Sequence, residues 1–129
     1  MEAKDLKILI CDDSVLVRSK MKKSFEKLGC TQLFEAGDGV QAVEMYNTHK
    51  PELVLVDIVM PVLDGIGALK AIKAIDSRAI VVMASSVGTE KYIKEAITAK
   101  ADEFLQKPIE QAQIEKLLKK VLEILNSRE

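Results

Sequence analysis

The sequence has 129 residues, of which 48% are hydrophobic and 30% are charged, and its formal net charge is −1. This length suits one compact domain with a buried core, and a nearly neutral chain lacks the positive field that would favour nucleic acid or an anionic membrane surface. The short apolar run near the amino terminus is followed by acids, and no stretch reaches the length of a membrane span, so we expect neither a signal peptide nor a transmembrane helix.

The first half of the sequence predicts two strands and two helices. An apolar run at Leu6–Cys11 is typical of a strand, and Ser14 can cap a helix that ends at Gly29. A short strand follows at Gln32–Glu35, and Asp38 can cap the second helix. The side chains expected to face the core are Val17, Met21, Phe25 and Leu28 in the first helix, and Val40, Val43 and Tyr46 in the second.

The second half continues this alternation after Pro51, which breaks the chain before a strand at Leu53–Val56. Asp64 and Gly65 open a third helix, and Ala79–Ala84 is a fully apolar strand. The remaining predicted elements are a helix from Thr89, a strand at Glu103–Leu105, a helix from Ile109 to Leu125 and a frayed end at residues 126–129. The inward-facing residues are expected to be Ile66, Leu69, Ile72 and Ile75, then Ile93 and Ile97, then Ile114, Leu117, Leu118, Val121 and Leu125.

Five strand–helix units in alternation favour an α/β fold. The central strands are apolar throughout, which is expected when helices cover both faces of a parallel sheet. Right-handed crossovers then favour a doubly wound sheet of five parallel strands with five helices. We find no repeat or linker, so we expect residues 1–129 to form a single domain without an output domain. The two cysteines, Cys11 and Cys30, form no metal or redox motif and indicate core thiols in a reducing compartment, which we take to be the cytoplasm.

Polar residues follow the predicted strands where each strand ends. The residues after the first, third, fourth and fifth strands are, in order, Asp12 with Asp13, Asp57, Ser85 with Ser86, and Lys107 with Pro108. Because functional groups gather at the carboxyl ends of the strands in open α/β sheets, we expect these side chains to converge. Three carboxylates repel one another and Lys107 supplies only one positive charge, so the group favours a hard divalent cation such as Mg²⁺. Asp57 can then act as a nucleophile that forms an aspartyl phosphate, with Lys107 and a serine hydroxyl stabilising charge on the transferred oxygens.

Each of these residues also has a purely structural explanation when it is taken alone. Asp13 or Ser14 can be a helix cap, and Asp57 can simply begin a loop. The two serines can be turn residues, and Lys107 can be one of many surface lysines. All of these explanations would have to hold at successive strand ends, so we prefer a shared site.

The chain resembles the receiver domains of response regulators, which are the phosphoacceptors of two-component signalling. The resemblance extends from Lys7 to about Leu125 and rests on the Asp12–Asp13 pair, the segment DIVMPVLDG, the segment MASS after the fourth strand and the Lys107–Pro108 pair. It implies a flavodoxin-like fold with the sheet order 2-1-3-4-5, an order that comes from the family and not from the sequence pattern.

The resemblance also implies roles for the acidic residues. Asp57 would be phosphorylated by a partner histidine kinase. Mg²⁺, or Mn²⁺ as a substitute, would be held by Asp57, Asp13 and the backbone carbonyl of Val59, with Asp12 acting largely through water. Ser85 would be the switch hydroxyl, and the other residues implied to take part are Lys107 as the partner of phosphate oxygens, Phe104 as an aromatic side chain that changes rotamer, and a cis peptide bond between Lys107 and Pro108.

Several residues depart from the commonest pattern of the family. Ser85 stands where threonine is more usual, and Ser86, close to the path to the phosphoryl group, stands where alanine or glycine is frequent. Phe104 lacks the hydroxyl of the often-seen tyrosine, so its switching cannot rely on a new hydrogen bond. Val59 and Val87 flank the expected entry path for water and cannot hold or activate a water molecule, so we predict slow self-dephosphorylation.

The resemblance implies that phosphorylation shifts a conformational population. The phosphoryl oxygens would draw Ser85 inward and reshape the surface of the fourth helix, the fifth strand and the fifth helix. The exposed residues that could contact a partner on this surface are Lys91, Lys94, Glu95, Gln106 and Lys119. For most of them, an ordinary charged surface exposed to solvent is an alternative explanation.

Without an output domain, the signal is expected to leave by protein binding. The sequence looks most like chemotaxis-type regulators, whose partners are the chemotaxis kinase and the flagellar motor switch; another downstream protein and a phosphatase are further expected partners.

One alternative is a phosphorelay intermediate that passes its phosphoryl group to a histidine phosphotransfer protein. A flavodoxin-like electron carrier is disfavoured because two acids follow the first strand, and a metal-dependent hydrolase is a fourth hypothesis. We expect a signalling protein and not an enzyme, with weak self-phosphorylation and autophosphatase chemistry.

Overall fold

The computed structural model describes residues 1–86 and 90–128. Within these residues five strands form one parallel sheet in the order β2-β1-β3-β4-β5. The strands are β1 (Lys7–Cys11), β2 (Gln32–Ala36), β3 (Leu53–Asp57), β4 (Ile80–Ser85) and β5 (Glu103–Gln106). The helices of the described residues are η1 (Ala3–Asp5), a short 3₁₀ helix, and α1 (Val15–Glu26), α2 (Gly39–His49), α3 (Gly65–Ile75), α4 (Glu90–Thr98) and α5 (Gln111–Ser127). The predicted doubly wound α/β fold and its sheet order are confirmed.

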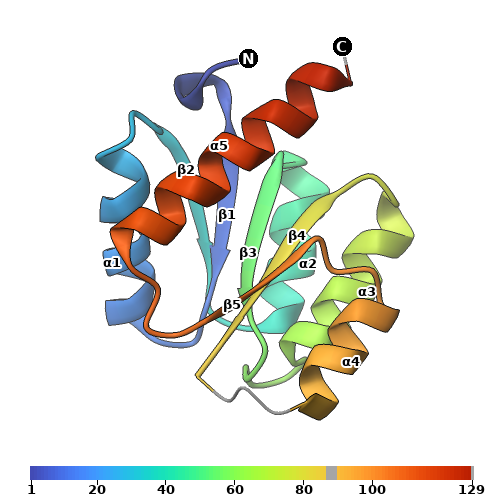
Figure 1. Ribbon diagram of the computed structural model, residues 1–129. Helices are drawn as coiled ribbons and strands as arrows, with labels where there is room; N and C mark the ends of the chain where they lie inside the picture. The colour runs from blue at the N-terminus through green and yellow to red at the C-terminus, as the bar shows by residue number, and fades with distance from the viewer. Residues whose placement is uncertain (87–89, 129) are drawn as a thin grey trace.

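Helices cover both faces of the sheet, with α1 and α5 on one face and α2, α3 and α4 on the other (Figure 1). Ile8 of β1 belongs to the layer that contains Phe25 of α1 and Ile114 of α5. Its neighbour Leu9 belongs to the opposite layer, with Leu69 of α3. Successive side chains of a strand point to opposite faces, and here both faces are apolar. The central strands are therefore buried on both sides, and polar side chains are left to the strand ends.

Three helices begin at the predicted caps. The side-chain oxygens of Ser14, Asp38 and Asp64 each accept a hydrogen bond from a backbone N–H of the first turn, at donor–acceptor distances of 3.2, 2.8 and 2.8 Å. Such caps satisfy backbone donors that have no partner within the helix. They fix the starts of α1, α2 and α3 near the carboxyl ends of the strands.

Three apolar residues that were predicted to face the core are exposed. Val40 of α2, Ile75 of α3 and Ile97 of α4 have 40%, 41% and 68% of their surface accessible. For α2 and α4, the reason is which residues lie on the face that packs against the sheet. In α2 this face includes Tyr46, and in α4 its one buried residue is Ala96. A small residue brings α4 against the sheet, so its neighbour Ile97 is rotated towards solvent.

The predicted start of the last helix is wrong, whereas that of the helix before it is not tested. The described part of α4 begins at Glu90, and the predicted start at Thr89 lies outside the described residues. The helix α5 begins at Gln111, because Glu110 is its amino-terminal cap and forms a capping box, whereas Ile109 precedes it.

The predicted frayed end is wrong up to Ser127, which is the last residue of α5. The Met1 ammonium donates a hydrogen bond to Asn126 Oδ1 at 3.0 Å, and Asn126 Nδ2 donates to the Met1 main-chain oxygen at 3.3 Å. Figure 1 places the amino terminus and the last turn of α5 at the end of the sheet that is opposite to the carboxyl ends of the strands. Among the described residues, no helix combines the length and the apolar character that crossing a membrane would require.

Gly65, the first residue of α3, packs directly against the end of β3. A Cβ atom on Gly65 would lie 2.1 Å from the Asp57 main-chain oxygen, whereas a Cβ atom on Gly37 would meet only side-chain atoms, at 3.5 Å or more. We therefore expect Gly65→Ala to lower the free energy of unfolding by about 3 kcal/mol, because the backbone must move. The control variant Gly37→Ala is expected to lower it by less than about 1 kcal/mol. Urea unfolding measures both, and equal stabilities would contradict the close packing of α3 on β3.

Candidate functional site

Three carboxylates meet at the carboxyl edge of the sheet. Asp12 follows β1 directly, Asp13 comes next, and Asp57 is the last residue of β3. Their ligand oxygens all lie within 4.8 Å of one another. Asp12 and Asp57 are buried, with 3% and 7% of their surface exposed, whereas Asp13 is exposed. The structure therefore brings together the three acids that the sequence pattern placed at strand ends.

The Lys107 ammonium lies between the two buried acids. Its Nζ atom is 2.5 Å from Asp12 Oδ2 and 3.2 Å from Asp57 Oδ1. The main-chain N–H of Lys107 donates to the Ser85 main-chain oxygen at 2.8 Å, which anchors this residue to the end of β4. Lys107 is thus held by the neighbouring strand while its side chain crosses to β1 and β3.

The pKa values reflect this crowding. Burial raises the pKa of Asp57 above its usual value; the negative charges of Asp12 and Asp13 act in the same direction, and Lys107 opposes them. Burial alone would lower the pKa of Lys107, but its hydrogen bond to Asp12 and the charges of Asp57 and Asp12 outweigh burial and raise it. Lys107 therefore stays positively charged, but its charge does not fully offset the effect of burial and of the neighbouring acids on the ionised Asp57 carboxylate.

Backbone hydrogen bonds hold the ends of the two acid-bearing strands against their outer neighbours, β1 against β2 and β3 against β4. The Asp12 N–H donates to the Ala36 oxygen of β2 at 3.0 Å, and the Ile58 N–H donates to the Ala84 oxygen of β4 at 3.0 Å. The Asp12 carboxylate accepts a further hydrogen bond from the Ser14 N–H at 2.9 Å. The acids are therefore fixed by the sheet and by the start of α1.

The other residues predicted for the site lie around this cluster. Ser85 is completely buried at the end of β4, and Ser86 is exposed. Val59 follows β3 with 56% of its surface exposed. The Lys107–Pro108 peptide bond is cis, the conformation that the resemblance implies. The predicted water-access residue Val87 lies outside the described residues.

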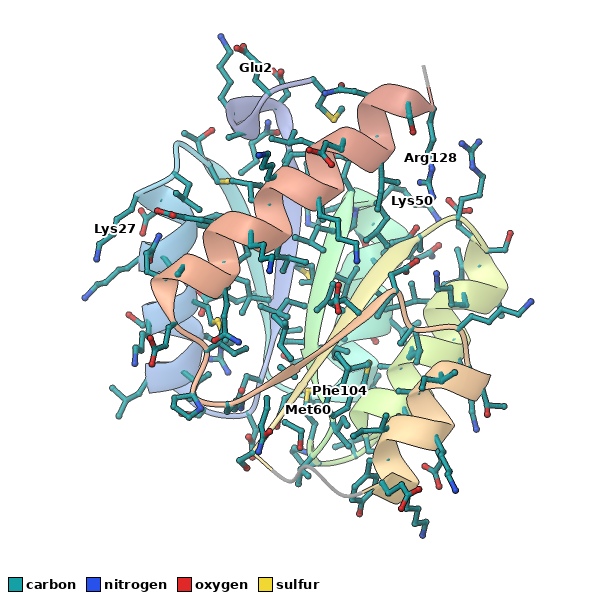
Figure 2. The ribbon with its side chains drawn as sticks, in the orientation of Figure 1. Glu2, Lys27, Lys50, Met60, Phe104 and Arg128 are labelled. Carbon is teal, nitrogen blue, oxygen red and sulfur yellow. The ribbon has the colours of Figure 1, made fainter. Side chains whose placement is uncertain are left out.

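Phe104 of β5 is half-buried against the core layer that contains Met60. Figure 2 places both labelled side chains near the carboxyl edge of the sheet. The residues predicted for a partner surface are exposed, except for half-buried Glu95; the exposed ones are Lys91, Lys94, Gln106 and Lys119. Lys94 also forms an exposed ion pair with Glu90 at 3.5 Å.

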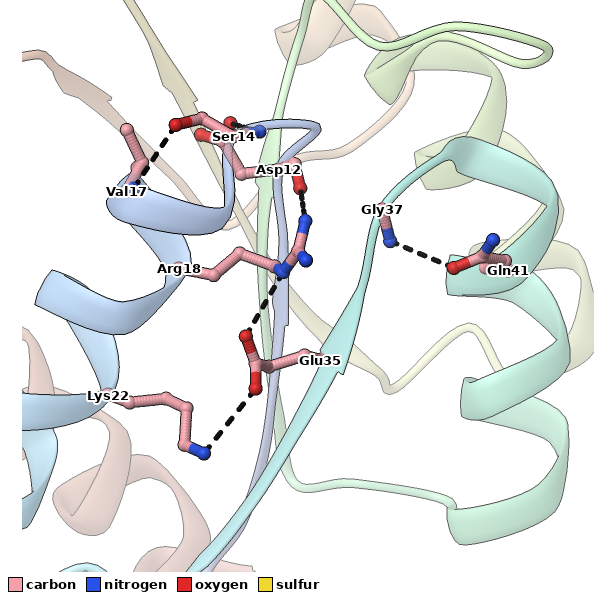
Figure 3. Close-up of polar contacts among 8 residues, drawn as sticks. All are labelled: Asp12, Ser14, Val17, Arg18, Lys22, Glu35, Gly37 and Gln41. Atoms are coloured by element: carbon pink, nitrogen blue, oxygen red, sulfur yellow. Dashed lines mark hydrogen bonds and ion pairs between the residues drawn. The ribbon is translucent and has the colours of Figure 1, made fainter.

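Sequence reasoning missed Arg18, which contacts the main chain of Asp12 and not the carboxylates of the cluster (Figure 3). Its Nη1 atom donates to the Asp12 main-chain oxygen at 2.5 Å, and its Nε atom donates to Glu35 Oε1 at 3.0 Å. A contact with a main-chain oxygen leaves no pattern in the sequence. The available signal was Glu35 itself, a charged residue inside the short predicted strand.

The donor set fits a hard divalent cation. Carboxylate oxygens are the protein ligands that Mg²⁺ prefers, and a site with one or two carboxylates, waters and phosphate oxygens is its usual environment. Here three carboxylates face a single ammonium group, so a cation would relieve the remaining repulsion. The cluster is therefore suited to hold Mg²⁺ and a phosphoryl group.

Comparisons with known proteins agree with this geometry. Residues 8–119 match the response regulator receiver domain. The chain is 41% identical over 116 residues to the chemotaxis protein CheY of Bacillus subtilis, covering 90% of this chain and 97% of that protein. It is 38% identical over 115 residues to the chemotaxis protein CheY of Halobacterium salinarum, covering 89% of this chain and 95% of that protein.

A solved structure extends the comparison. The complex of CheX and CheY with BeF3 and Mg²⁺ from Borrelia burgdorferi matches with a TM-score of 0.83 and 34% identity, covering 93% of this chain and 89% of that one. The sequence match, the relatives and the fold all extend over most of the chain, and its acids lie together at the carboxyl edge of the sheet. This protein belongs to the response regulator receiver domain family.

Proposed function

We propose that this protein is a phosphorylation-activated signalling switch of chemotaxis, which accepts a phosphoryl group on Asp57 from a histidine kinase. The observation that carries the proposal is the buried Asp57 carboxylate at the tip of β3, 3.2 Å from Lys107 and inside a cluster of three acids. Relatives named as chemotaxis proteins support the pathway. The family is a signalling one, so the phosphoryl group is expected to stay on the protein as a signal and not to leave as an enzyme product.

The residues around Asp57 supply the parts of a phosphoryl transfer. An Asp57 oxygen attacks the phosphorus atom of the donor, and the bond between phosphorus and the donor's leaving group breaks. Lys107 donates to the transferred oxygens, on which negative charge is concentrated. Asp13, Asp57 and the Val59 carbonyl would hold Mg²⁺, and Asp12 would act through water. When bound, Mg²⁺ neutralises charge on the acids and on the phosphoryl oxygens, and Mn²⁺ is expected to substitute for it.

The output is proposed to follow from Ser85. Its side chain is completely buried at the end of β4, and its main-chain oxygen accepts the N–H of Lys107 on the neighbouring segment. A phosphoryl group on Asp57 would draw the Ser85 hydroxyl towards it, and Phe104 would change its rotamer. The surface of α4, β5 and α5 would then bind a different partner.

The proposed partners are proteins. They are a chemotaxis-type histidine kinase, the flagellar motor switch or another downstream protein, and a phosphatase. The complex of CheX with CheY supports a protein partner for this chain as well. We place these interactions in the cytoplasm, where the related chemotaxis proteins are expected to act.

Incubation with acetyl phosphate and Mg²⁺ is the direct test of the phosphoacceptor. We expect the intact mass to rise by one phosphoryl group in the wild type and not in Asp57→Asn, because the amide cannot attack phosphorus. The change should disappear when EDTA removes Mg²⁺. The exposed helix residue Glu44 offers a control, since Glu44→Gln should be phosphorylated like the wild type. A phosphoryl group on Asp57→Asn, or none on the wild type with any donor, would refute the proposal.

The raised pKa of Asp57 predicts an effect on stability without metal. The pKa of Asp57 is higher in the folded protein than in the unfolded chain. The folded protein therefore loses stability as the pH rises from the unfolded-state pKa to the folded-state pKa. At pH 7 and without divalent cations, Asp57→Asn should therefore raise the melting temperature, and this gain should shrink in acid. Mg²⁺ should stabilise the wild type more than the variant, because it binds the folded protein.

Calorimetry with and without Mg²⁺ measures both effects, and Glu44→Gln again serves as the control. A melting temperature for Asp57→Asn that is below that of the wild type at pH 7 would contradict the uncompensated charge.

Slow self-dephosphorylation is predicted from Val59. Its exposed hydrocarbon side chain cannot orient an attacking water molecule. After the donor is removed, we expect the aspartyl phosphate to decay over minutes and not seconds, as followed by intact mass. Val59→Asn should accelerate the decay several-fold, whereas Val62→Asn, an exposed position further along the same loop, should leave it unchanged. Decay within seconds in the wild type would contradict the prediction.

A further inference from the structure

Arg18 touches the acidic cluster only through the main chain. Its side chain is 16% exposed and lies between α1, the end of β1 and β2. Nη1 donates to the Asp12 oxygen at 2.5 Å and Nε donates to Glu35 Oε1 at 3.0 Å, so one planar guanidinium bridges two strands (Figure 3). Lys22 binds the other oxygen of Glu35 at 3.4 Å and does not take part in the contact with Asp12.

Every polar group of Asp12 has a partner. Its N–H donates to Ala36, one carboxylate oxygen accepts from the Ser14 N–H and the other from Lys107. Its main-chain oxygen accepts from Arg18. The contact with Arg18 is the one that fixes the peptide group between Asp12 and the next residue.

That peptide group determines where Asp13 lies. The Asp12 carbonyl, the Asp13 N–H and the Asp13 Cα belong to one planar unit, so holding the oxygen also restrains where the Asp13 Cα lies. Within the described residues, the exposed Asp13 side chain forms no hydrogen bond or ion pair that would hold it. The position of its carboxylate beside Asp57 therefore depends on the backbone.

We infer that Arg18 is a positioning residue for the Mg²⁺ site, acting on Asp13 through the Asp12 peptide group. This inference rests on the proposed function, in which Asp13 is a metal ligand. The guanidinium is suited to the task because two of its N–H groups point in fixed directions to two acceptors. A lysine ammonium has the same charge, but it lacks this rigid geometry.

The charge of Arg18 would act in the opposite direction. A positive group near a cation site weakens cation binding, and here the Glu35 carboxylate neutralises part of that effect. If Arg18 acted only through its charge, its removal would strengthen Mg²⁺ binding. If it acts by positioning, its removal must weaken Mg²⁺ binding, so the sign of the change separates the two effects.

The experiment is a Mg²⁺ titration of the purified, unphosphorylated protein, followed by calorimetry and by the amide resonance of Asp13. Arg18→Met is expected to weaken Mg²⁺ binding about tenfold, as is typical when a group that orients a metal ligand is lost. Arg18→Lys, which keeps the charge, should weaken it several-fold. The matched control Lys22→Met, which removes the other cation on Glu35, should bind Mg²⁺ like the wild type.

The remaining outcomes are distinct. A merely structural role would lower the melting temperature of the metal-free variants, but it would leave their Mg²⁺ affinity and the Asp13 resonance unchanged; that result, or tighter binding, would overturn the inference. If Arg18→Met does not fold, Arg18→Lys alone decides. Failure of the wild type to bind Mg²⁺ would overturn the proposed function, whereas equal binding by the wild type and the Arg18 variants would overturn only this inference.

Discussion

The ion pairs of Lys107 are the constraint on which the acidic end of this fold depends. A carboxylate without a partner costs several kcal/mol to bury, and Asp12 and Asp57 are both buried. Lys107 reaches both acids, and its main chain is bound to the end of β4. One side chain near the end of β5 thus fixes the ends of β1 and β3. One ammonium cannot neutralise three acids, so the arrangement that allows folding also leaves a negative charge that attracts a divalent cation.

The parallel sheet makes this concentration of charge tolerable. Its central strands are covered on both faces by apolar layers, which leaves the carboxyl edge as the place where polar groups can reach water. The close contact of Gly65 with the Asp57 main chain holds α3 against this edge. The acids are therefore held by rigid elements, and the residues proposed to move, such as Ser85 and Phe104, lie on other strands, β4 and β5.

The sequence was sufficient to predict most of the fold and the central part of the site. Alternating apolar runs and cap residues such as Ser14 are local signals, and parallel strands bring their ends together whatever the details of packing. The exposure of Ile97 could not be predicted. Helical periodicity shows that one face of the helix is apolar, but it does not show that the small residue Ala96 is the one that packs against the sheet. Arg18 was missed because its partner is a main-chain oxygen, which any residue can offer. The hydrogen bonds between Met1 and Asn126 join opposite ends of the chain, for which the sequence has no local signal.

These contacts between Met1 and Asn126 place the two chain ends side by side, away from the acidic cluster. A short flexible linker can therefore join them, and the chain can be opened instead at an exposed turn, in a circular permutant that keeps every strand neighbour. Fluorescent labels or fused reporter domains attached next to Met1 or to the end of α5 would likewise leave the approach to Asp57 clear. The topology thus separates the part of the molecule that can be engineered from the part that carries the chemistry.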